Sequence, residues 1–486
     1  MKSFKKVQED RIAYHRDPSK FSVHRSSLLI PIVNNYDAII SFLNHFLIKR
    51  NNKSVSIKLS AYGTGGKLKD TYFEEISEKR VYEFNLSNIF SNIADLKSFQ
   101  AEFFSSKNLF IPFPAVIVQH KSKNSKNIIH SYNRILNDAD EDIKINSNIN
   151  YESSFEAIKT QKSCTCFIFH TGQEKIRGRI RIEIFEGNKK KIFYESVNLP
   201  AFSSKIYSLK KYLKTKDQFY FCRILQPRQK MFFGRILVGS FSNKYGFFTA
   251  NHSYYDSSNL NENFNNSVSY RQYPYFHNFQ NTIKFYPING KSNLAIYIKV
   301  GNIEYFAGNI TSPSSDHLDV NVNMLLNKNK IKSDTYTVIA KSMKKIPTRV
   351  NHQLIIGKFK SDYNSSINVS LLNEEIYKPN NKKSYIWGMT QYDKKYDTVL
   401  HILGKHPTDE SKCKLSLYSE QGLIFSKKVH IKPSQKITLN NDFCKKLKIK
   451  NDNTLWYSVE SNSQNLQAFT VTSNNKSGVS SGEHNF

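Results

Sequence analysis

KLSAYG, at residues 58–63, is the first of four related segments in this chain. The others are IEIFEG at 182–187, IYIKVG at 296–301 and LYSEQG at 417–422. Their closing glycines, Gly63, Gly187, Gly301 and Gly422, follow one another at 124, 114 and 121 residues. A repeat of this kind is a property of the whole chain and constrains its architecture before any local detail does. The sequence therefore predicts four similar modules in tandem.

A second shared feature follows each glycine. An alternating run leads to a proline, small polar residues and a third run; the prolines are Pro200, Pro313 and Pro433. They stand 13, 12 and 11 residues after the glycine, whereas the first copy has SEKRVYEFNL instead. Proline cannot donate to a strand ladder, so it belongs at a strand end or a turn. We expect a corner of constant geometry between two strands.

Two further runs complete each copy and indicate the fold class. They are FQAEFF and PAVIVQH, QFYFCRIL and FGRILVGSF, DTYTVIA and HQLIIGKF, and LWYSVES and LQAFTVT. Short runs of β-branched and aromatic residues, separated by Gly, Asn, Ser and Pro, are typical of antiparallel strands. We predict an all-β protein of four tandem antiparallel β-sandwich-like modules of about 100–120 residues, each with about five to seven strands. The predicted limits are an N-terminal arm at 1–25 and modules at 26–137, 155–258, 278–362 and 383–486.

Length and composition agree with several domains. The chain has 486 residues, of which 39% are hydrophobic and 13% aromatic, enough for three or four cores at the usual domain size. No run approaches the about 18–20 apolar residues that a transmembrane helix needs. The basic N-terminus lacks the apolar stretch of a secretory signal, so the expectation is a cytoplasmic protein, with surface or particle association left open.

The formal charge of +31 invites a nucleic-acid interpretation. The lysines, however, are spread along the whole chain, and the densest runs (121–126, 188–191 and 342–345) fall in predicted loops. Such runs usually belong to a solvated face. Joint enrichment in Lys and Asn also fits an AT-rich genome. Nucleic acid is therefore a disfavoured partner, and an acidic polymer or surface is an equally good electrostatic match.

The five cysteines do not form a disulfide framework, because they are sparse and odd in number. Cys164 and Cys166 would face the same side of a strand. They could be half of a metal site, but no second pair stands at ligand spacing, and small strand residues explain them better. We predict no metal and no cofactor.

The best candidate for a ligand site is a histidine followed by an aromatic residue at the end of a module. An alternative interpretation is that these residues pin the last strand against its sandwich. The third copy differs, with Asn351 and His352 in another place. The candidate residues are His130 and Tyr132, His252 with Tyr254 and Tyr255, and His484 with Phe486.

Catalytic motifs are absent from the sequence. It contains no phosphate-binding loop, no nucleophile elbow and no HExxH pair. AYGTGG at 61–66 is glycine-rich but stands where the other copies have a simple hairpin turn. The expectation is a protein that is not an enzyme.

A single module resembles the sensory rhodopsin transducer family of small β-sandwich domains. The similar features are the strand and glycine turn, the proline corner and a late strand of the type PAVIVQH, residues 114–120. The resemblance covers about 90 residues of each copy, close to one sandwich. It implies a soluble, oligomeric binding or signalling adaptor. Only His120 matches a family residue, a histidine at the end of this strand; the other copies have Gly239-Ser240, Gly357-Lys358 and Val471-Thr472 nearby.

Together these observations favour a non-catalytic binding or scaffold protein that engages carbohydrate or a cell-envelope polysaccharide assembly. The chain has 28 Tyr and 35 Phe but only two Trp, so tyrosines would have to stack on sugars. The alternative is a structural subunit of a large assembly, such as a phage or surface-layer particle, with protein partners or self-assembly. A third interpretation is non-specific nucleic-acid binding, which would weaken steeply with salt.

Overall fold

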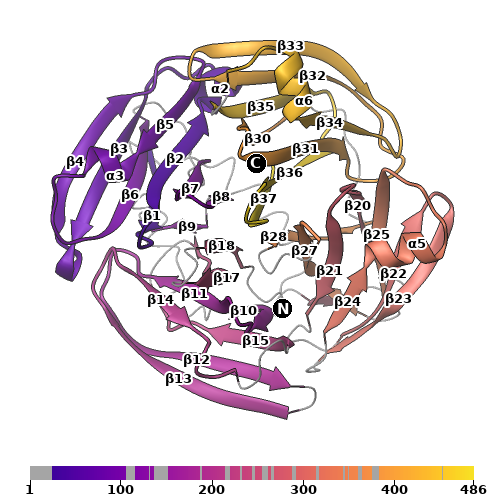
Figure 1. The fold of residues 1–486 in the computed structure, drawn as a ribbon, viewed down its shortest axis with the longest axis horizontal. Helices are drawn as coiled ribbons and strands as arrows, with labels where there is room; N and C mark the ends of the chain where they lie inside the picture. The colour runs from indigo at the N-terminus through magenta and orange to yellow at the C-terminus, as the bar shows by residue number, and fades with distance from the viewer. Residues whose placement is uncertain are drawn as a thin grey trace. The chain divides into compact units, whose positions relative to one another are not determined.

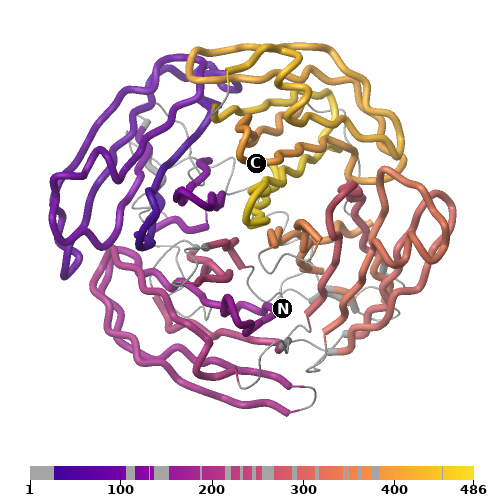
Figure 2. Tube along the Cα trace, viewed as in Figure 1, coloured from indigo at the N-terminus to yellow at the C-terminus, as the bar shows by residue number. Residues whose placement is uncertain are grey.

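The computed structural model describes most of the chain, and Figure 2 traces it with the remaining residues in grey. The predicted N-terminal arm lies almost entirely outside the described residues. These are 24–105, 115–130, 132–135, 152–186, 189–213, 219–229, 233–242, 247–253, 261–263, 267–286, 292–312, 317–342, 345–347, 350–359, 364–374, 383–450 and 453–486.

The fold is all-β, as predicted. Eight antiparallel sheets of four or five strands make up four modules, two sheets to a module. Module 1 has the orders β1-β6-β3-β4 and β5-β2-β7-β8, and each of the other modules has its own eight strands in the same order. Module 3 adds β29 to one sheet. Figure 1 shows the strands of each module in one colour range.

Modules 1 and 2 are formed by residues 24–135 and 152–253. Their strands and helices are β1 (His24–Pro31), β2 (Asp37–Leu43), α2 (His45–Arg50), β3 (Val55–Gly63), η1 (Thr64–Gly66), β4 (Leu68–Glu75), β5 (Val81–Asn85), α3 (Leu86–Ile89), β6 (Leu96–Ser105), β7 (Ile117–Lys121), β8 (Lys126–His130) and β9 (Asn133–Arg134), followed by β10 (Glu152–Ile158), β11 (Cys164–His170), β12 (Ile176–Glu186), β13 (Lys189–Leu199), β14 (Ser204–Ser208), β15 (Phe219–Leu225), β16 (Phe233–Gly234), β17 (Leu237–Ser242) and β18 (Phe247–His252).

Modules 3 and 4 are formed by residues 261–374 and 383–486. Their strands and helices are β19 (Asn261–Asn263), β20 (Ser267–Pro274), β21 (Gln280–Phe285), β22 (Ser292–Val300), β23 (Ile303–Ser312), β24 (Leu318–Asn321), α5 (Val322–Lys328), β25 (Thr335–Ser342), β26 (Lys345–Pro347), β27 (Asn351–Gly357), β28 (Ser365–Ser370) and β29 (Leu372–Asn373), followed by β30 (Ser384–Tyr392), β31 (Tyr396–Gly404), β32 (Ser411–Ser419), β33 (Gly422–Ile431), β34 (Lys436–Asn440), α6 (Asn441–Lys446), β35 (Asn453–Ser461), β36 (Leu466–Asn474) and β37 (Ser480–His484).

In modules 1, 3 and 4 the glycine signature lies at or beside the turn that leads into β4, β23 or β33, whereas Gly187 of module 2 lies outside the described residues. Gly301 lies between β22 and β23 with φ 58°, and Gly422 begins β33 with φ 106°. In module 1 the turn is longer, and Gly65 and Gly66 take the positive φ angles instead. These conformations favour glycine because it lacks a Cβ. The repeat thus marks one hairpin in each of these three modules.

Some strands were not expected. Eight strands in the same order form the two sheets of each module, where the sequence predicts five to seven, and β20 (Ser267–Pro274) lies between the predicted modules at 155–258 and 278–362. Its partner β25 pairs with it along its whole length. Its polar residues Ser269, Arg271 and Gln272 hide the alternation, and pairing with the neighbouring strand decides the conformation. The predicted module limits themselves stay predictions.

The chain divides into two compact units. One contains modules 1 and 2, and the other contains modules 3 and 4. We call them the N-terminal and C-terminal units. Each unit is described separately below.

The corner after the predicted proline joins the two modules of a unit. In the N-terminal unit the Ser98 hydroxyl donates to the Phe202 carbonyl oxygen at 2.5 Å, and the ring of Tyr62 stacks on Phe202 at 4.7 Å. In the C-terminal unit the Thr335 hydroxyl donates to the Ser434 carbonyl oxygen at 3.2 Å. Phe202 and Ser434 both have positive φ, 51° and 56°. At this corner the backbone carbonyl of the second module accepts a hydrogen bond from a side-chain hydroxyl of the first module.

The last strands of the two modules also meet within each unit. In the N-terminal unit the Ala250 amide of β18 donates to the Asn127 side-chain oxygen of β8 at 2.8 Å. In the C-terminal unit Gly482 of β37 lies so close to Ile367 of β28 that a Cβ would stand 2.8 Å from its Cδ1. Figure 1 shows β28 and β37 side by side. Each unit is thus a packed pair of modules.

Candidate functional site

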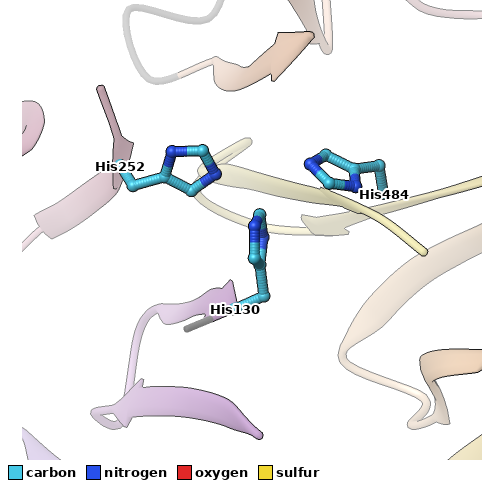
Figure 3. A group of neighbouring side chains, drawn as sticks. All are labelled: His130, His252 and His484. Carbon is cyan, nitrogen blue, oxygen red and sulfur yellow. The ribbon is translucent and has the colours of Figure 1, made fainter. Parts of the chain in front are cut away.

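Two predicted site histidines meet inside the N-terminal unit. His130 ends β8 and His252 ends β18, and their rings stand nearly perpendicular with centroids 4.3 Å apart. Figure 3 draws both rings. Both side chains are buried. Burial lowers the pKa of His130 to about 3, with the charge of Arg235 acting in the same direction. A neutral, buried ring of this kind suits packing between two modules.

Tyr132, two residues beyond His130, is also enclosed at this junction. Its side chain is completely buried, and burial raises its pKa well above the ordinary value. Its ring lies 5.5 Å from that of His170, at the end of β11, and its carbonyl oxygen accepts from the Arg235 amide at 2.9 Å. Tyr254 and Tyr255 lie outside the described residues.

In the C-terminal unit, His484 and Phe486 hold down the end of the chain. His484 is half-buried, and its Nδ1 lies 2.8 Å from the Asn485 carbonyl oxygen. The ring of Phe486 stacks on Trp387 and Trp456, both at 6.1 Å, and its amide donates to the Trp387 carbonyl at 2.9 Å. Every predicted site residue that the structure describes therefore has a packing environment, which favours the pinning interpretation.

The remaining singled-out residues are also packed. The Tyr273 hydroxyl lies 2.7 Å from Nε2 of His352, and burial lowers the pKa of that histidine to about 3. Cys164 and Cys166 are free thiols on β11, and burial raises the pKa of Cys166 to about 12. A thiol with a high pKa is a poor nucleophile and metal ligand.

A different surface is exposed in all four modules. It consists of one strand from the end of a sheet in each module, β4, β13, β23 and β33, which we call the edge strands. Each is the last strand of its sheet, so one side of its backbone has no neighbouring strand among the described residues. They are long, with 8, 11, 10 and 10 residues. Long edges offer unpaired backbone groups to another strand.

The edge strands concentrate the exposed apolar side chains. Nine of the eleven exposed large hydrophobic residues in the described part of the chain lie on them. A folded protein usually scatters such residues singly, whereas gathered ones mark interaction surfaces. The nine are Leu68, Tyr72, Phe73, Ile192, Tyr194, Ile303, Phe306, Leu423 and Ile424.

In the sequence these strands are the alternating run that follows each glycine, and that pattern predicts no exposed edge. In β13 neither face is strongly apolar, because the exposed Ile192 and Tyr194 alternate with the partly buried Phe193 and Glu195. Whether its outer face is covered depends on the sheet order, which the local sequence does not show.

Comparisons with known proteins identify no family for this chain. No protein-family model and no curated protein matches it. Among solved structures, dimeric latent PorU from Porphyromonas gingivalis is similar at 11% identity over 88% of this chain and 41% of that chain, with a TM-score of 0.16. Sidekick-1 immunoglobulin domains 1–5 are similar at 8% identity over 95% of this chain and 98% of that chain, with a TM-score of 0.09.

Within the described residues, no helix is both long enough and apolar enough to cross a membrane.

Proposed function

We propose that this protein is a non-catalytic scaffold that binds other protein chains along its four edge strands. The observation that carries the proposal is the concentration of exposed apolar side chains on β4, β13, β23 and β33. Strand addition needs an unpaired backbone edge for affinity and side-chain positions on alternate faces for specificity. The edge strands supply both, once in every module.

The pairing of modules supports a scaffold role. The proline corner and the last strands join the two modules in each unit, so two edge strands are held by one packed body. In the C-terminal unit Leu403, Phe469 and Val471 of module 4 belong to the core of module 3. Two binding strands on one packed body raise the effective concentration of the second contact after the first has formed.

Binding of an acidic polysaccharide is a second candidate, on module 2. Tyr194 is exposed on β13, and the neighbouring strand β12 carries the exposed Arg177 and Arg179. An aromatic face beside guanidinium groups can hold an anionic sugar. In contrast, Trp387 and Trp456 are both buried and cannot serve as sugar platforms. Loss of polyanion binding in a Tyr194→Ala variant, with binding of neutral glycans absent throughout, would support this candidate.

The scaffold proposal is tested by site-specific photo-crosslinking in the native cells. A photoreactive phenylalanine replaces Phe73 or Tyr194 on the edge strands, or Met324 or Phe359 as matched controls. All four positions are exposed apolar side chains, but the two controls lie off the edge strands. We expect protein adducts from the edge positions and none from the controls. Equal yields at all four positions, or no protein adducts at Phe73 and Tyr194, would contradict the proposal.

A further inference from the structure

The edge strands differ in charge in a regular way. β4 contains one Lys, one Asp and two Glu, a net charge of −2, and β23 contains a single Glu, a net charge of −1. β13 contains three Lys and one Glu, a net charge of +2, and β33 contains two Lys, also +2 with neutral His. The first module of each unit therefore has an acidic edge and the second a basic edge.

We infer that the acidic edge β4 of one copy of this chain pairs with the basic edge β13 of a second copy. The inference rests on the proposed function and names its partner. Opposite charges directly across an antiparallel pair stabilise it, and like charges destabilise it. Two acidic edges or two basic edges would repel each other, so pairing between copies selects one acidic and one basic strand.

The two sequences fit in one antiparallel register. With Tyr72 opposite Ile192, an aromatic side chain meets a β-branched one, a favourable cross-strand pair. Lys69 then stands opposite Glu195, which already lies 2.5 Å from Lys211. Of the six remaining facing pairs, Glu74–Lys190 and Glu75–Lys189 join opposite charges; the others are Leu68–Ser196, Asp70–Tyr194, Thr71–Phe193 and Phe73–Lys191.

The facing side chains are accessible in the single chain. Phe73 is 63% exposed and Ile192 is 41% exposed, and Lys189, Lys190 and Glu75 are exposed. The internal ion pair of Lys190 is long, 3.9 Å to Glu183. Other facing groups already have partners within the chain, since the Tyr72 hydroxyl donates to Glu74 at 2.7 Å and Lys191 lies 3.6 Å from Glu186. Pairing covers apolar side chains that are otherwise in water.

The register also fixes which faces join. In β4, Tyr72 stands opposite the buried Leu59 of β3 and so belongs to the core side of its sheet. In β13, Phe193 packs against the core of module 2, so Ile192 points to the outer side. Joining Tyr72 to Ile192 places the two sandwiches on opposite faces of the joined sheet. The contact is heterologous, so it either closes into a ring or continues as a chain of copies.

The experiment uses the purified full chain and measures mass by light scattering over a range of concentrations at low and high salt. We expect multiples of the 56.5 kDa chain mass that dissociate as salt screens the facing charges. Glu74→Lys with Glu75→Lys, or Lys189→Glu with Lys190→Glu, each shifts the protein to single copies. Combining all four substitutions in one chain restores the large species, which also shows that the reversed strands still fold.

A matched control reverses the same amount of charge away from the edges. Lys162→Glu with Lys175→Glu alters two exposed loop lysines of module 2 and leaves the mass unchanged. A wild-type protein that stays a single copy under all conditions, or a fourfold variant that does not recover, overturns the inference. If photo-crosslinks from Phe73 to other proteins still formed in that case, the proposed scaffold function would be retained. If they were also absent, both the pairing of β4 with β13 and the scaffold function would be wrong.

Discussion

At the scale of single residues, the glycine-rich turn of module 1 has a role that no turn type requires. A Cβ on Gly66 would stand 2.2 Å from the Ala201 carbonyl oxygen, next to the corner that joins modules 1 and 2. Gly65 also has positive φ, yet nothing lies within 4 Å of its Cβ position. Substitutions at the two adjacent glycines therefore distinguish the cost of a positive φ from the cost of a clash between modules.

We predict that Gly66→Ala destabilises the N-terminal unit more than Gly65→Ala does. Both substitutions force alanine into the left-handed region, which costs about 1–2 kcal/mol. Only Gly66→Ala adds a clash with the carbonyl oxygen of Ala201. The check is the free energy of unfolding from urea titrations of the two variants. Equal losses would show that the module junction has no need of a glycine at Gly66.

His120 is a buried histidine whose neutral form the junction requires. Its Nε2–H donates to the Pro31 carbonyl oxygen at 3.0 Å, and its ring meets the edge of Phe248 at 5.5 Å. Burial lowers its pKa from 6.5 to about 4, and the Pro31 hydrogen bond offsets this only in part. Below pH 6.5 His120 binds a proton in the unfolded chain but stays neutral in the folded chain down to about pH 4. Folding therefore becomes less favourable as the pH falls.

We predict that neutral His120 makes its full contribution to the free energy of unfolding above pH 6.5. This contribution falls by about 1.4 kcal/mol per pH unit down to about pH 4. A His120→Gln variant keeps a donor for Pro31 but cannot titrate. Its free energy of unfolding should therefore fall less steeply with acid than that of the wild type. Parallel curves for the two proteins between pH 6.5 and 4 would contradict the prediction.

At the scale of elements, a short capped helix follows the corresponding strand in three modules, β5, β24 and β34. It is α3, α5 and α6, and the caps are Asn85, Asn321 and Asn440, whose side-chain oxygens each accept from the amide three residues on. Module 2 has a turn at this place, where Ser208 Oγ accepts from the Lys210 amide at 3.3 Å. These helices were not predicted, because four to seven residues are too few for an apolar period to appear.

We predict that Asn440→Ala lowers the free energy of unfolding of the C-terminal unit by about 1 kcal/mol, the usual value of an N-cap. Asn440→Ser keeps an acceptor for the Phe443 amide and should lose much less. Thermal unfolding of the two variants makes the comparison. A serine variant as unstable as the alanine variant would mean that the side chain acts through some contact other than the cap.

At the scale of the whole molecule, the modules are not independent, because they share cores and junctions in pairs. We predict that residues 256–486, expressed alone, unfold in one cooperative transition, because both modules contribute to one hydrophobic cluster. Residues 383–486 alone would expose Leu403, Phe469 and Val471, which pack on module 3. Circular dichroism during heating tests both fragments. A separate, equally sharp transition for 383–486 would contradict the shared core.

The sequence by itself determined the class and the repetition. Alternation with a period of two and a glycine at a constant place are local properties, so the hairpin at Gly301 and Gly422 and the strands after it could be predicted. The resemblance to a small sandwich family stays a prediction. The strand β20 was missed because its conformation comes from pairing with β25, which is distant along the chain.

Only the tertiary structure decided what the singled-out residues do. The sequence predicts His130 and Tyr132 as ligand-site residues, but both are buried between modules because the last strands β8 and β18 meet there. Phe73 and Tyr194 read as ordinary strand residues but are exposed, since β4 and β13 end their sheets. Burial depends on sheet order and on how modules pack, and both are set by contacts between residues far apart in the sequence.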